Sequence, residues 1–316
     1  MTIGSNGPRP TKNQRRESAR EKAREHRIVA QKSERRRRGL VQGGVVAGIV
    51  VIAAVIGLVI WGSVPQPGPR PANMASDGIV LQAKLDASGK PTGEIEAVLN
   101  QALPSGSEPT TTTQDPNLLN IVIYQDFQCP VCKNFDAADY PLIEERVASG
   151  AATVEIHPVA ILDRVSMGTR YSSRAANAAA CVATYDPNSF LSLNSALYTN
   201  QPAENSPGLD DAGIKKLIDS LAIQRKDEIG KCIDDETFKA WVEAATTRVK
   251  LATALPNTKD IRFEGTPTVI VNGTQFNFTT DPNTGAFYPQ QFSDFLLKLA
   301  GLTEQSSSTS TPTPTK

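Results

Sequence analysis

Two cysteines separated by a proline and a valine lie in the first half of the chain. The stretch QDFQCPVCKNF places Cys129 and Cys132 three positions apart, with Pro130 and Val131 between them. Such a pair can be half of a zinc site, a structural disulfide, or a redox pair that exchanges disulfides with other proteins. The compartment of the cysteines and the residues beside them decide which chemistry applies.

A zinc site is disfavoured because the chain offers few ligands. Structural zinc takes four ligands, commonly from two Cys pairs or from one pair and two histidines. This chain has a single CxxC motif, and its two histidines are His26 in a basic N-terminal segment and His157 on an expected strand. No glycine-rich phosphate loop or nucleotide fingerprint is present. The sequence therefore predicts neither a metal site nor a bound cofactor.

The place of the pair in the expected secondary structure favours redox chemistry. The β-branched run at 118–124 is typical of a buried strand, and helical spacing begins at Pro130. Proline suits the first turn of a helix, where its missing N–H costs nothing. The unpaired amides and the dipole of that turn favour a thiolate at Cys129 and lower its pKa below about 8.5. We expect Cys129 to be the nucleophile and the more buried Cys132 to be the resolving thiol.

Two other classes of protein use the same residues. A Cys–His hydrolase would take Cys129 as nucleophile and His157 as base, although a single histidine on a strand is more often packed or hydrogen-bonded. A thioredoxin-fold binding module would keep the pair as a passive disulfide. Asp126, three positions before Cys129, is a candidate for moving protons at the site or for capping the helix.

The elements that position the pair follow an α/β pattern. We expect strands at 78–81, 118–124 and 151–162, a helix from 130 to about 150, helices over most of 168–255, a hairpin at 268–278 and a final helix at 289–301. Asn272 and Gly273 form a preferred hairpin turn. This order predicts a β-sheet core interrupted by an all-helical insertion.

The N-terminal part of the sequence predicts a membrane anchor. Residues 1–38 carry thirteen Lys or Arg and four Glu, a formal charge of +9, and residues 39–62 are uncharged and mostly apolar. A helix needs roughly 20 apolar residues to cross a bilayer, and basic residues stay on the cytoplasmic side. We expect a cytoplasmic tail at 1–38 and a transmembrane helix at 39–62. The alternative is a cleaved signal peptide, and both place the cysteines in an oxidising exterior.

The expected domains follow from these boundaries. A Pro-rich linker at 63–76 leads to a folded domain at 77–302, and a Ser/Thr/Pro tail at 303–316 has nothing apolar to bury and is expected to be disordered. The basic tail is adjacent to a membrane span, which favours a topology signal over nucleic-acid binding.

The sequence resembles a known family over about residues 77–302. The order strand, Cys-Pro-x-Cys, helix, helical insertion and Thr-Pro before a β-branched strand is similar to the DsbA-like thiol–disulfide oxidoreductases, as is the pattern Asp-Phe-x-Cys-Pro-x-Cys from Asp126 to Cys132. The resemblance implies a thioredoxin-like fold with an inserted helical domain at about 168–258, in a membrane-anchored bacterial protein. In that family the Thr-Pro peptide is cis and lies against the disulfide, which implies this role for Thr266 and Pro267.

The resemblance also implies a function and partners. The family forms or exchanges disulfides in secreted proteins and is reoxidised by a quinone-linked membrane protein of the DsbB or VKOR type. Its strongest oxidants carry His at the position of Val131 and often Val at that of Thr266. We therefore expect a pKa of Cys129 nearer the roughly 7 of thioredoxin than the roughly 3.5 of DsbA, and a potential more negative than about −120 mV. An oxidase is favoured, and isomerase or reductase activity stays open.

Cys181 and Cys232 remain once Cys129 is paired with Cys132. We expect them to form a structural disulfide between two helices, and the alternative is a second redox pair. In the loop-entropy model, closing a loop of about 50 residues stabilises a fold by roughly 4 kcal/mol.

Overall fold

The computed structural model describes residues 21, 24, 68–281, 287–288 and 290–299. The chain divides into two compact units, Met1–Pro65 and Gln66–Lys316. In the first unit only Glu21 and Arg24 are described, and both are helical and exposed. The second unit carries all four cysteines.

The anchor and the tail predicted from the sequence lie outside the described residues. The expected span at 39–62 and the Ser/Thr/Pro segment at 303–316 both fall there, as does most of the basic segment at 1–38. No helix in the described part of the chain is long and apolar enough to cross a membrane.

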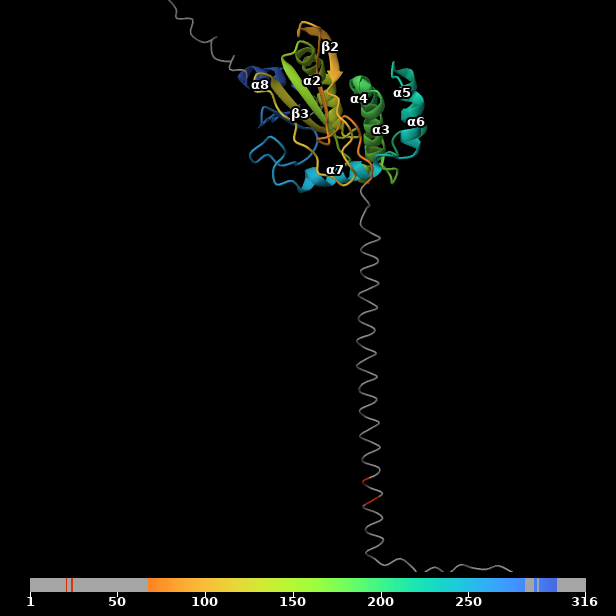
Figure 1. Ribbon diagram of the computed structural model, residues 1–316. Helices are drawn as coiled ribbons and strands as arrows, with labels where there is room; N and C mark the ends of the chain where they lie inside the picture. Colours follow the sequence, from red (N-terminus) through yellow and green to blue (C-terminus); the bar gives the residue numbers. More distant parts are fainter. Residues whose placement is uncertain (1–20, 22–23, 25–67, 282–286, 289, 300–316) are drawn as a thin grey trace, which may run out of the picture. The chain divides into compact units, whose positions relative to one another are not determined.

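A six-stranded sheet forms the centre of the described domain (Figure 1). In chain order its strands are β1 (Ile79–Leu85), β2 (Pro91–Ala97), β3 (Leu119–Gln125), β4 (Ala152–Pro158), β5 (Thr268–Val271) and β6 (Thr274–Gln275). Their order across the sheet is β2-β1-β4-β3-β5-β6. β3 and β4 are parallel, and the remaining neighbours pair antiparallel. β3 therefore lies inside the sheet, with its C-terminal end next to the start of β5.

Strand β3 is buried on both faces, which explains its nearly continuous apolar sequence. Ile121 and Ile123 join the main hydrophobic core, whereas Val122 and Tyr124 belong to a smaller cluster on the opposite face. A strand that buries both faces loses the polar–apolar alternation of a half-exposed strand. β3 is accordingly a rigid support for the loop that follows it.

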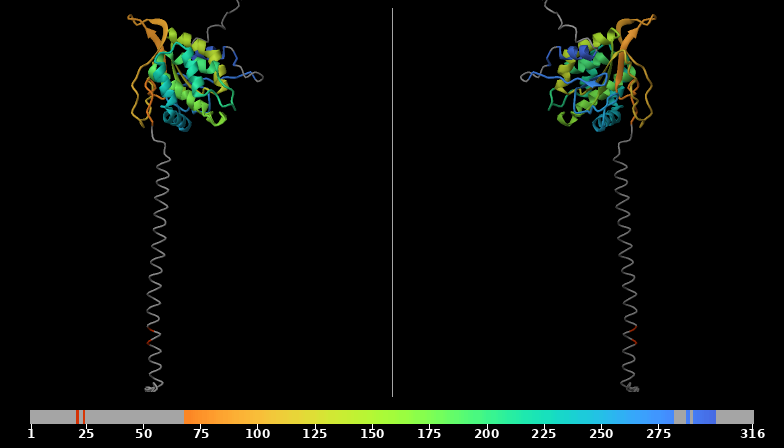
Figure 2. Two further views of the ribbon diagram at one scale, coloured as in Figure 1. Left: turned by 90° about the vertical axis from the view of Figure 1, so that its right-hand side faces the viewer. Right: turned by 90° about the vertical axis from the view of Figure 1, so that its left-hand side faces the viewer.

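Helices cover both faces of the sheet, as the rotated views show (Figure 2). In chain order they are α2 (Pro130–Ala148), α3 (Tyr171–Tyr185), α4 (Phe190–Thr199), α5 (Asp211–Ser220), α6 (Lys226–Asp234), α7 (Lys239–Leu251) and α8 (Gln291–Leu299), with short 3-10 turns at Asp163–Val165 and Pro187–Ser189. Phe135 of α2 packs edge-to-face on Phe292 of α8 in the main core. Val249 of α7 belongs to the smaller cluster with Tyr124.

Helix α2 begins and ends as its sequence predicts. Cys129 is the N-cap residue in an extended conformation, and Pro130 occupies the first turn. After the C-cap Ser149, Gly150 adopts a positive φ of 76°, a conformation that glycine adopts without steric cost. The helix thus starts at the cysteine pair and stops before β4.

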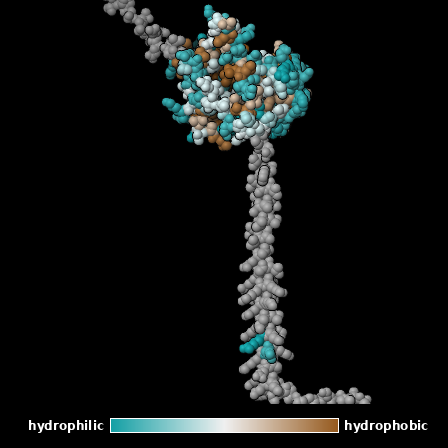
Figure 3. Space-filling model, in the orientation of Figure 1, coloured by the Kyte–Doolittle hydropathy of each residue, from teal (hydrophilic) through white to brown (hydrophobic). Residues whose placement is uncertain are grey.

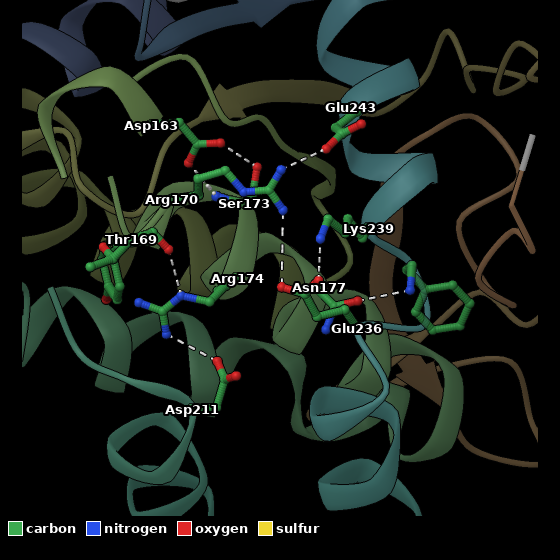
Figure 4. Close-up of polar contacts among 12 residues, drawn as sticks. Asp163, Thr169, Arg170, Ser173, Arg174, Asn177, Asp211, Glu236, Lys239 and Glu243 are labelled. Atoms are coloured by element: carbon green, nitrogen blue, oxygen red, sulfur yellow. Dashed lines mark hydrogen bonds and ion pairs between the residues drawn. The ribbon is translucent and has the colours of Figure 1, made fainter. Parts of the chain in front are cut away.

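Helices α3 to α7 form the insertion between β4 and β5. α3 is its central element, and six alanines on it are almost completely buried, which lets the surrounding helices approach closely. Ion pairs lie around α3: Arg170 with Glu243 and Arg174 with Asp211, each at 3.0 Å (Figure 4). The outer surface over α5 and α6 is mostly polar (Figure 3).

The start of the folded domain differs from the expected boundary. The predicted linker at 63–76 is too long, because Arg70, Asn73 and Met74 are buried in the domain. Arg70 forms a 2.7 Å ion pair with Asp77, which also accepts a hydrogen bond from Trp241 of α7. The segment before β1 is therefore fixed to the helical insertion rather than serving as a tether.

Several elements also differ from the sequence prediction. β1 is longer than expected, and β2 was not predicted because this edge strand is mostly exposed and lacks apolar alternation. α6 lies within residues 168–255, over most of which helices were expected. β4 ends at Pro158 rather than at residue 162, and β6 ends at Gln275 rather than at residue 278. The predicted turn at Asn272 and Gly273 is confirmed by positive φ angles of 48° and 74°.

Candidate active site

The fold brings three segments together around Cys129. The strand β3 ends at Gln125, the loop 126–129 follows, and α2 starts at Pro130. Tyr124 of β3 pairs with Thr268 of β5, so the residues just before β5 lie beside this loop. The thiol of Cys129 donates a hydrogen bond to the carbonyl oxygen of Thr266, at 3.2 Å. The peptide bond between Thr266 and Pro267 is cis.

The two cysteines differ in exposure and are not joined to each other in this structure. Cys129 retains 6% of its surface, whereas Cys132, one turn into α2, retains 2%. Pro130 between them is exposed and Val131 is half-buried against the main core. A reacting partner would therefore reach the sulfur of Cys129 before that of Cys132.

The protein environment shifts the pKa values of the two thiols in opposite directions. The pKa of Cys129 is lowered to about 7, mainly by a hydrogen bond from the Cys132 thiol. Burial opposes this shift, and hydrogen bonds from Thr266 and from the backbone N–H groups of Cys132 and Val131 add to it. The last two are unpaired amides of the first helical turn, the contribution expected at a helix N-terminus.

The pKa of Cys132 is raised well above its usual value. Burial is the largest cause, followed by the hydrogen bond to Cys129 and the negative charge of Cys129. Near neutral pH, Cys129 is therefore partly thiolate while Cys132 remains protonated. This asymmetry suits one thiol to react with a partner and the other to resolve the product.

Asp126 is completely buried and does not cap α2. The N-cap residue is Cys129, and it makes no side-chain capping bond. The Asp126 carboxylate instead accepts hydrogen bonds from four donors: the backbone N–H groups of Gln128, Ile161 and Leu162 and the hydroxyl of Ser172. Among the described residues, no hydrogen bond joins the side-chain carboxylate of Asp126 to either cysteine sulfur. The expected role in moving protons therefore finds no support in the contacts of this side chain.

Gln201, just after α4, is a site residue that the sequence does not indicate. Its side-chain amide donates to the carbonyl oxygens of Phe127 and Cys129, at 3.0 and 2.9 Å. It thereby satisfies the backbone of the loop that precedes α2. Nothing in the residue types or spacing near Gln201 could have predicted this contact, because 72 positions separate it from Cys129.

His157 is a packed residue rather than a partner of Cys129. It stacks on Tyr124 with ring centroids 4.4 Å apart, and its Nε2 lies 3.1 Å from Glu155. Tyr124 and His157 line a cavity of about 160 Å³ between the sheet and α7. Neither Cys129 nor Cys132 lines this cavity. The contacts of His157 therefore give no support to a Cys–His hydrolase.

Cys181 and Cys232 form a disulfide between α3 and α6. Both residues are buried, with 0% and 3% of their surface exposed, so neither sulfur is open to a protein partner. No group of three or more His, Cys, Asp or Glu side chains among the described residues is arranged to hold a metal ion.

Comparison with known proteins relates the chain to one family and to several solved structures. Residues 117–286, more than half of the chain, match the family model described as Thioredoxin. The comparison with curated proteins gave no match.

Three solved structures illustrate the similarity. Reduced DsbA from Mycobacterium tuberculosis is 26% identical over 71% of this chain and 93% of its own, with a TM-score of 0.49. The reduced disulfide oxidoreductase DsbG from the same organism is 28% identical over 61% and 85%, with a TM-score of 0.48. Oxidised BdbD from Bacillus subtilis is 17% identical over 74% and 97%, with a TM-score of 0.46.

The family match rests on sequence, and the structure agrees with it in its sheet, its cysteine pair at the start of α2 and its cis-proline. The helical insertion between β4 and β5 is the feature expected from the DsbA-like resemblance. The chain therefore belongs to the thioredoxin family.

Proposed function

We propose that this protein forms disulfide bonds in secreted proteins, using Cys129 and Cys132 as its redox pair. The observation that carries the proposal is the pKa of Cys129, lowered to about 7, next to a buried Cys132 whose pKa is raised. A passive binding module has no need of this asymmetry, because a structural disulfide does not titrate.

The exchange transfers two electrons from a client protein to the pair. In the oxidised enzyme a client thiolate attacks the sulfur of Cys129, the Cys129–Cys132 bond breaks, and Cys132 leaves and takes up a proton. A second client thiolate then attacks the client sulfur of the mixed disulfide and releases the Cys129 thiolate. The client gains one disulfide, and its two electrons remain on the two enzyme thiols. Because the Cys129 thiolate is stabilised, this last step is favoured.

In the reverse direction the Cys129 thiolate attacks a client disulfide and Cys132 resolves the mixed disulfide. That direction gives reductase activity, or isomerase activity if the client re-forms another bond. We favour oxidation because the proposed location is extracytoplasmic. Reoxidation would then require a quinone-linked membrane protein of the DsbB or VKOR type, which accepts the two electrons.

We propose that the protein is anchored in a bacterial cell membrane by residues 39–62, with residues 1–38 in the cytoplasm and the domain outside. The charge pattern of the N-terminal segment supports this orientation. The disulfide between Cys181 and Cys232 supports an oxidising compartment, since such bonds are rare in the cytosol. A membrane-impermeant maleimide should label Cys129 in intact cells after mild reduction. Labelling that requires cell lysis would contradict the location.

The activity is tested with the oxidised full-length protein and a reduced, unfolded client with two cysteines. We expect client oxidation with the loss of one enzyme disulfide per client disulfide, and no oxidation by the Cys129→Ser variant. A Cys132→Ala variant should instead remain covalently joined to clients through Cys129. Reactivation of a client with scrambled disulfides, without net oxidation, would favour an isomerase. If the cysteine pair neither oxidises clients nor forms mixed disulfides with them, the proposed exchange activity is wrong. The alternative of a non-catalytic thioredoxin-fold binding module would then remain.

A further inference from the structure

The loop between β3 and α2 is held by a buried carboxylate that the exchange reaction itself does not use. Asp126 has no exposed surface. One carboxylate oxygen accepts from the N–H of Gln128 at 2.8 Å and from the hydroxyl of Ser172 at 2.7 Å. The other accepts from the N–H groups of Ile161 and Leu162, at 2.8 and 3.0 Å. These donors come from three separate segments: the loop itself, the β4–α3 connection and α3.

Keeping this carboxylate ionised costs free energy. Burial raises the pKa of Asp126 to about 6, although all four hydrogen bonds favour the charged form. A buried charge without a cationic partner is an unfavourable way to secure a loop. Charged groups held at such a cost are concentrated at functional sites.

The backbone of Asp126 interacts with both cysteines. Its N–H forms a hydrogen bond with Cys132 that lowers the pKa of that thiol, against the larger effect of burial. Its carbonyl oxygen accepts from the N–H of Cys129, at 3.0 Å. The carboxylate and the amide of the same residue thus link the surrounding segments to the resolving thiol.

We infer that Asp126 is a positioning residue: its carboxylate, held by four donors, fixes the turn 126–129 so that its own N–H stabilises the Cys132 thiolate during resolution. This inference deepens the proposed disulfide exchange and rests on it. Asp126 acts through the backbone and does not exchange a proton with either sulfur.

The variant Asp126→Asn separates positioning from a simple charge effect by the sign of the result. An asparagine amide has one acceptor end, its oxygen, and one donor end, its NH2 group. The NH2 group must therefore face at least one backbone N–H that donates a hydrogen bond to the carboxylate in the wild type. The turn should then loosen and the Cys132 thiolate should lose its N–H donor. If Asp126 acted only through its negative charge, removing that charge would instead favour the Cys132 thiolate.

The test follows resolution of a chromogenic mixed disulfide and needs no client. Reduced full-length protein is treated with 5,5′-dithiobis(2-nitrobenzoate), which attaches one thionitrobenzoate group to Cys129. The Cys132 thiolate then attacks the Cys129 sulfur, its proton passes to the buffer, the Cys129–Cys132 disulfide forms and the coloured thiolate leaves. The rate of this second release depends on the thiolate fraction of Cys132.

We expect Asp126→Asn to release the second chromophore about tenfold more slowly than wild type, in line with the loss of one hydrogen bond to a charged group. Ser172→Ala, which removes one of the four donors and keeps the charge, should slow it less. Ser173→Ala is the matched control, because this neighbouring buried serine donates to Asp163 rather than to Asp126 (Figure 4). Its release rate should equal that of wild type.

Each outcome bears on the inference. Faster release in Asp126→Asn would show a charge effect and overturn positioning. Unchanged release in a folded Asp126→Asn protein would make the residue merely structural. If Asp126→Asn does not fold by circular dichroism, Ser172→Ala decides, and a rate equal to that of Ser173→Ala overturns the inference. A wild-type adduct that never releases its second chromophore would contradict the proposed function together with the inference.

Discussion

The sulfur of Cys129 lies 3.2 Å from the carbonyl oxygen of Thr266, although 137 positions separate the two residues in the chain. The antiparallel pairing of β3 with β5 produces this contact, because it brings the end of one strand next to the start of the other. The residue before Pro267 is therefore part of the environment of the reactive thiol. Its side chain should influence the ionisation of that thiol.

Replacing Thr266 with valine should raise the pKa of Cys129. The hydrogen bond from the Thr266 side chain favours the thiolate, and valine has a similar shape without a donor. We expect the pKa to rise from about 7 toward about 8, the size of effect of one hydrogen bond to a charged group. The absorbance of the thiolate at 240 nm as a function of pH measures it. Thr268→Val is the control, since this hydroxyl donates to the Gly265 carbonyl, and equal pKa values in both variants would contradict the assignment.

Replacing Val131 with histidine should make the protein a stronger oxidant. Val131 contributes only its backbone N–H to the Cys129 thiolate, whereas an imidazolium would add a positive charge near it. We expect a lower pKa of Cys129 and a less negative reduction potential, by about 30 mV for each tenfold stabilisation of the reduced form. Equilibration with glutathione buffers measures the potential, and Val131→Leu should leave it unchanged. A potential that stays constant in Val131→His would show that the residue between Pro130 and Cys132 does not set the redox poise.

The elements that bury apolar residues at a regular spacing could be predicted from the sequence. β3, α2 and the helical insertion carry such patterns, and the start of α2 at Pro130 followed from the chemistry of proline. β2 could not be predicted in this way because its exposed residues carry no pattern. β4 ended early for a tertiary reason: the N–H groups of Ile161 and Leu162 donate to Asp126 instead of continuing the ladder.

The residues of the candidate site also differ in whether a local sequence pattern could predict them. Cys129, Cys132 and the Thr266–Pro267 peptide carry local motifs and were found from them. The contacts of Gln201 and Ser172 depend on how α4 and α3 pack against the loop 126–129, and no local pattern encodes that packing. The helix cap considered for Asp126 was wrong for this reason, since the partners of its carboxylate lie 35 or more positions away, apart from Gln128, whereas its role in moving protons stays a prediction.

Replacing both Cys181 and Cys232 with alanine should destabilise the domain without stopping exchange at Cys129. The bond closes a loop between residues 51 positions apart, and the chain-entropy model gives a loss of about 4 kcal/mol in the free energy of unfolding. Urea unfolding of the oxidised proteins measures the loss. The Cys129→Ala/Cys132→Ala double variant provides the comparison for cysteine removal at the active site. Loss of client oxidation with an unchanged fold would instead identify Cys181 and Cys232 as a second redox pair.

The buried carboxylate of Asp126 should make the stability of the protein depend on pH in a defined direction. Burial raises its pKa to about 6 in the folded state, whereas an unfolded chain titrates near about 3.9. Between these values the folded state binds more protons. The resulting stabilisation is present below about pH 4 and is lost as the pH rises through about 6, by a total of about 3 kcal/mol.

Asp126→Asn removes this titration, so the stability of wild type relative to the variant should fall by that amount from pH 4 to pH 7. Asp136 and Asp139 also have pKa values raised to about 6 by burial, but they are present in both proteins and cancel in the comparison. The hydrogen bonds lost in the variant add an offset that does not depend on pH. Urea unfolding of both proteins at half-unit pH steps measures the difference. A difference that is constant across this range would mean that Asp126 titrates near its ordinary pKa, and the free-energy cost assigned to its burial would be wrong.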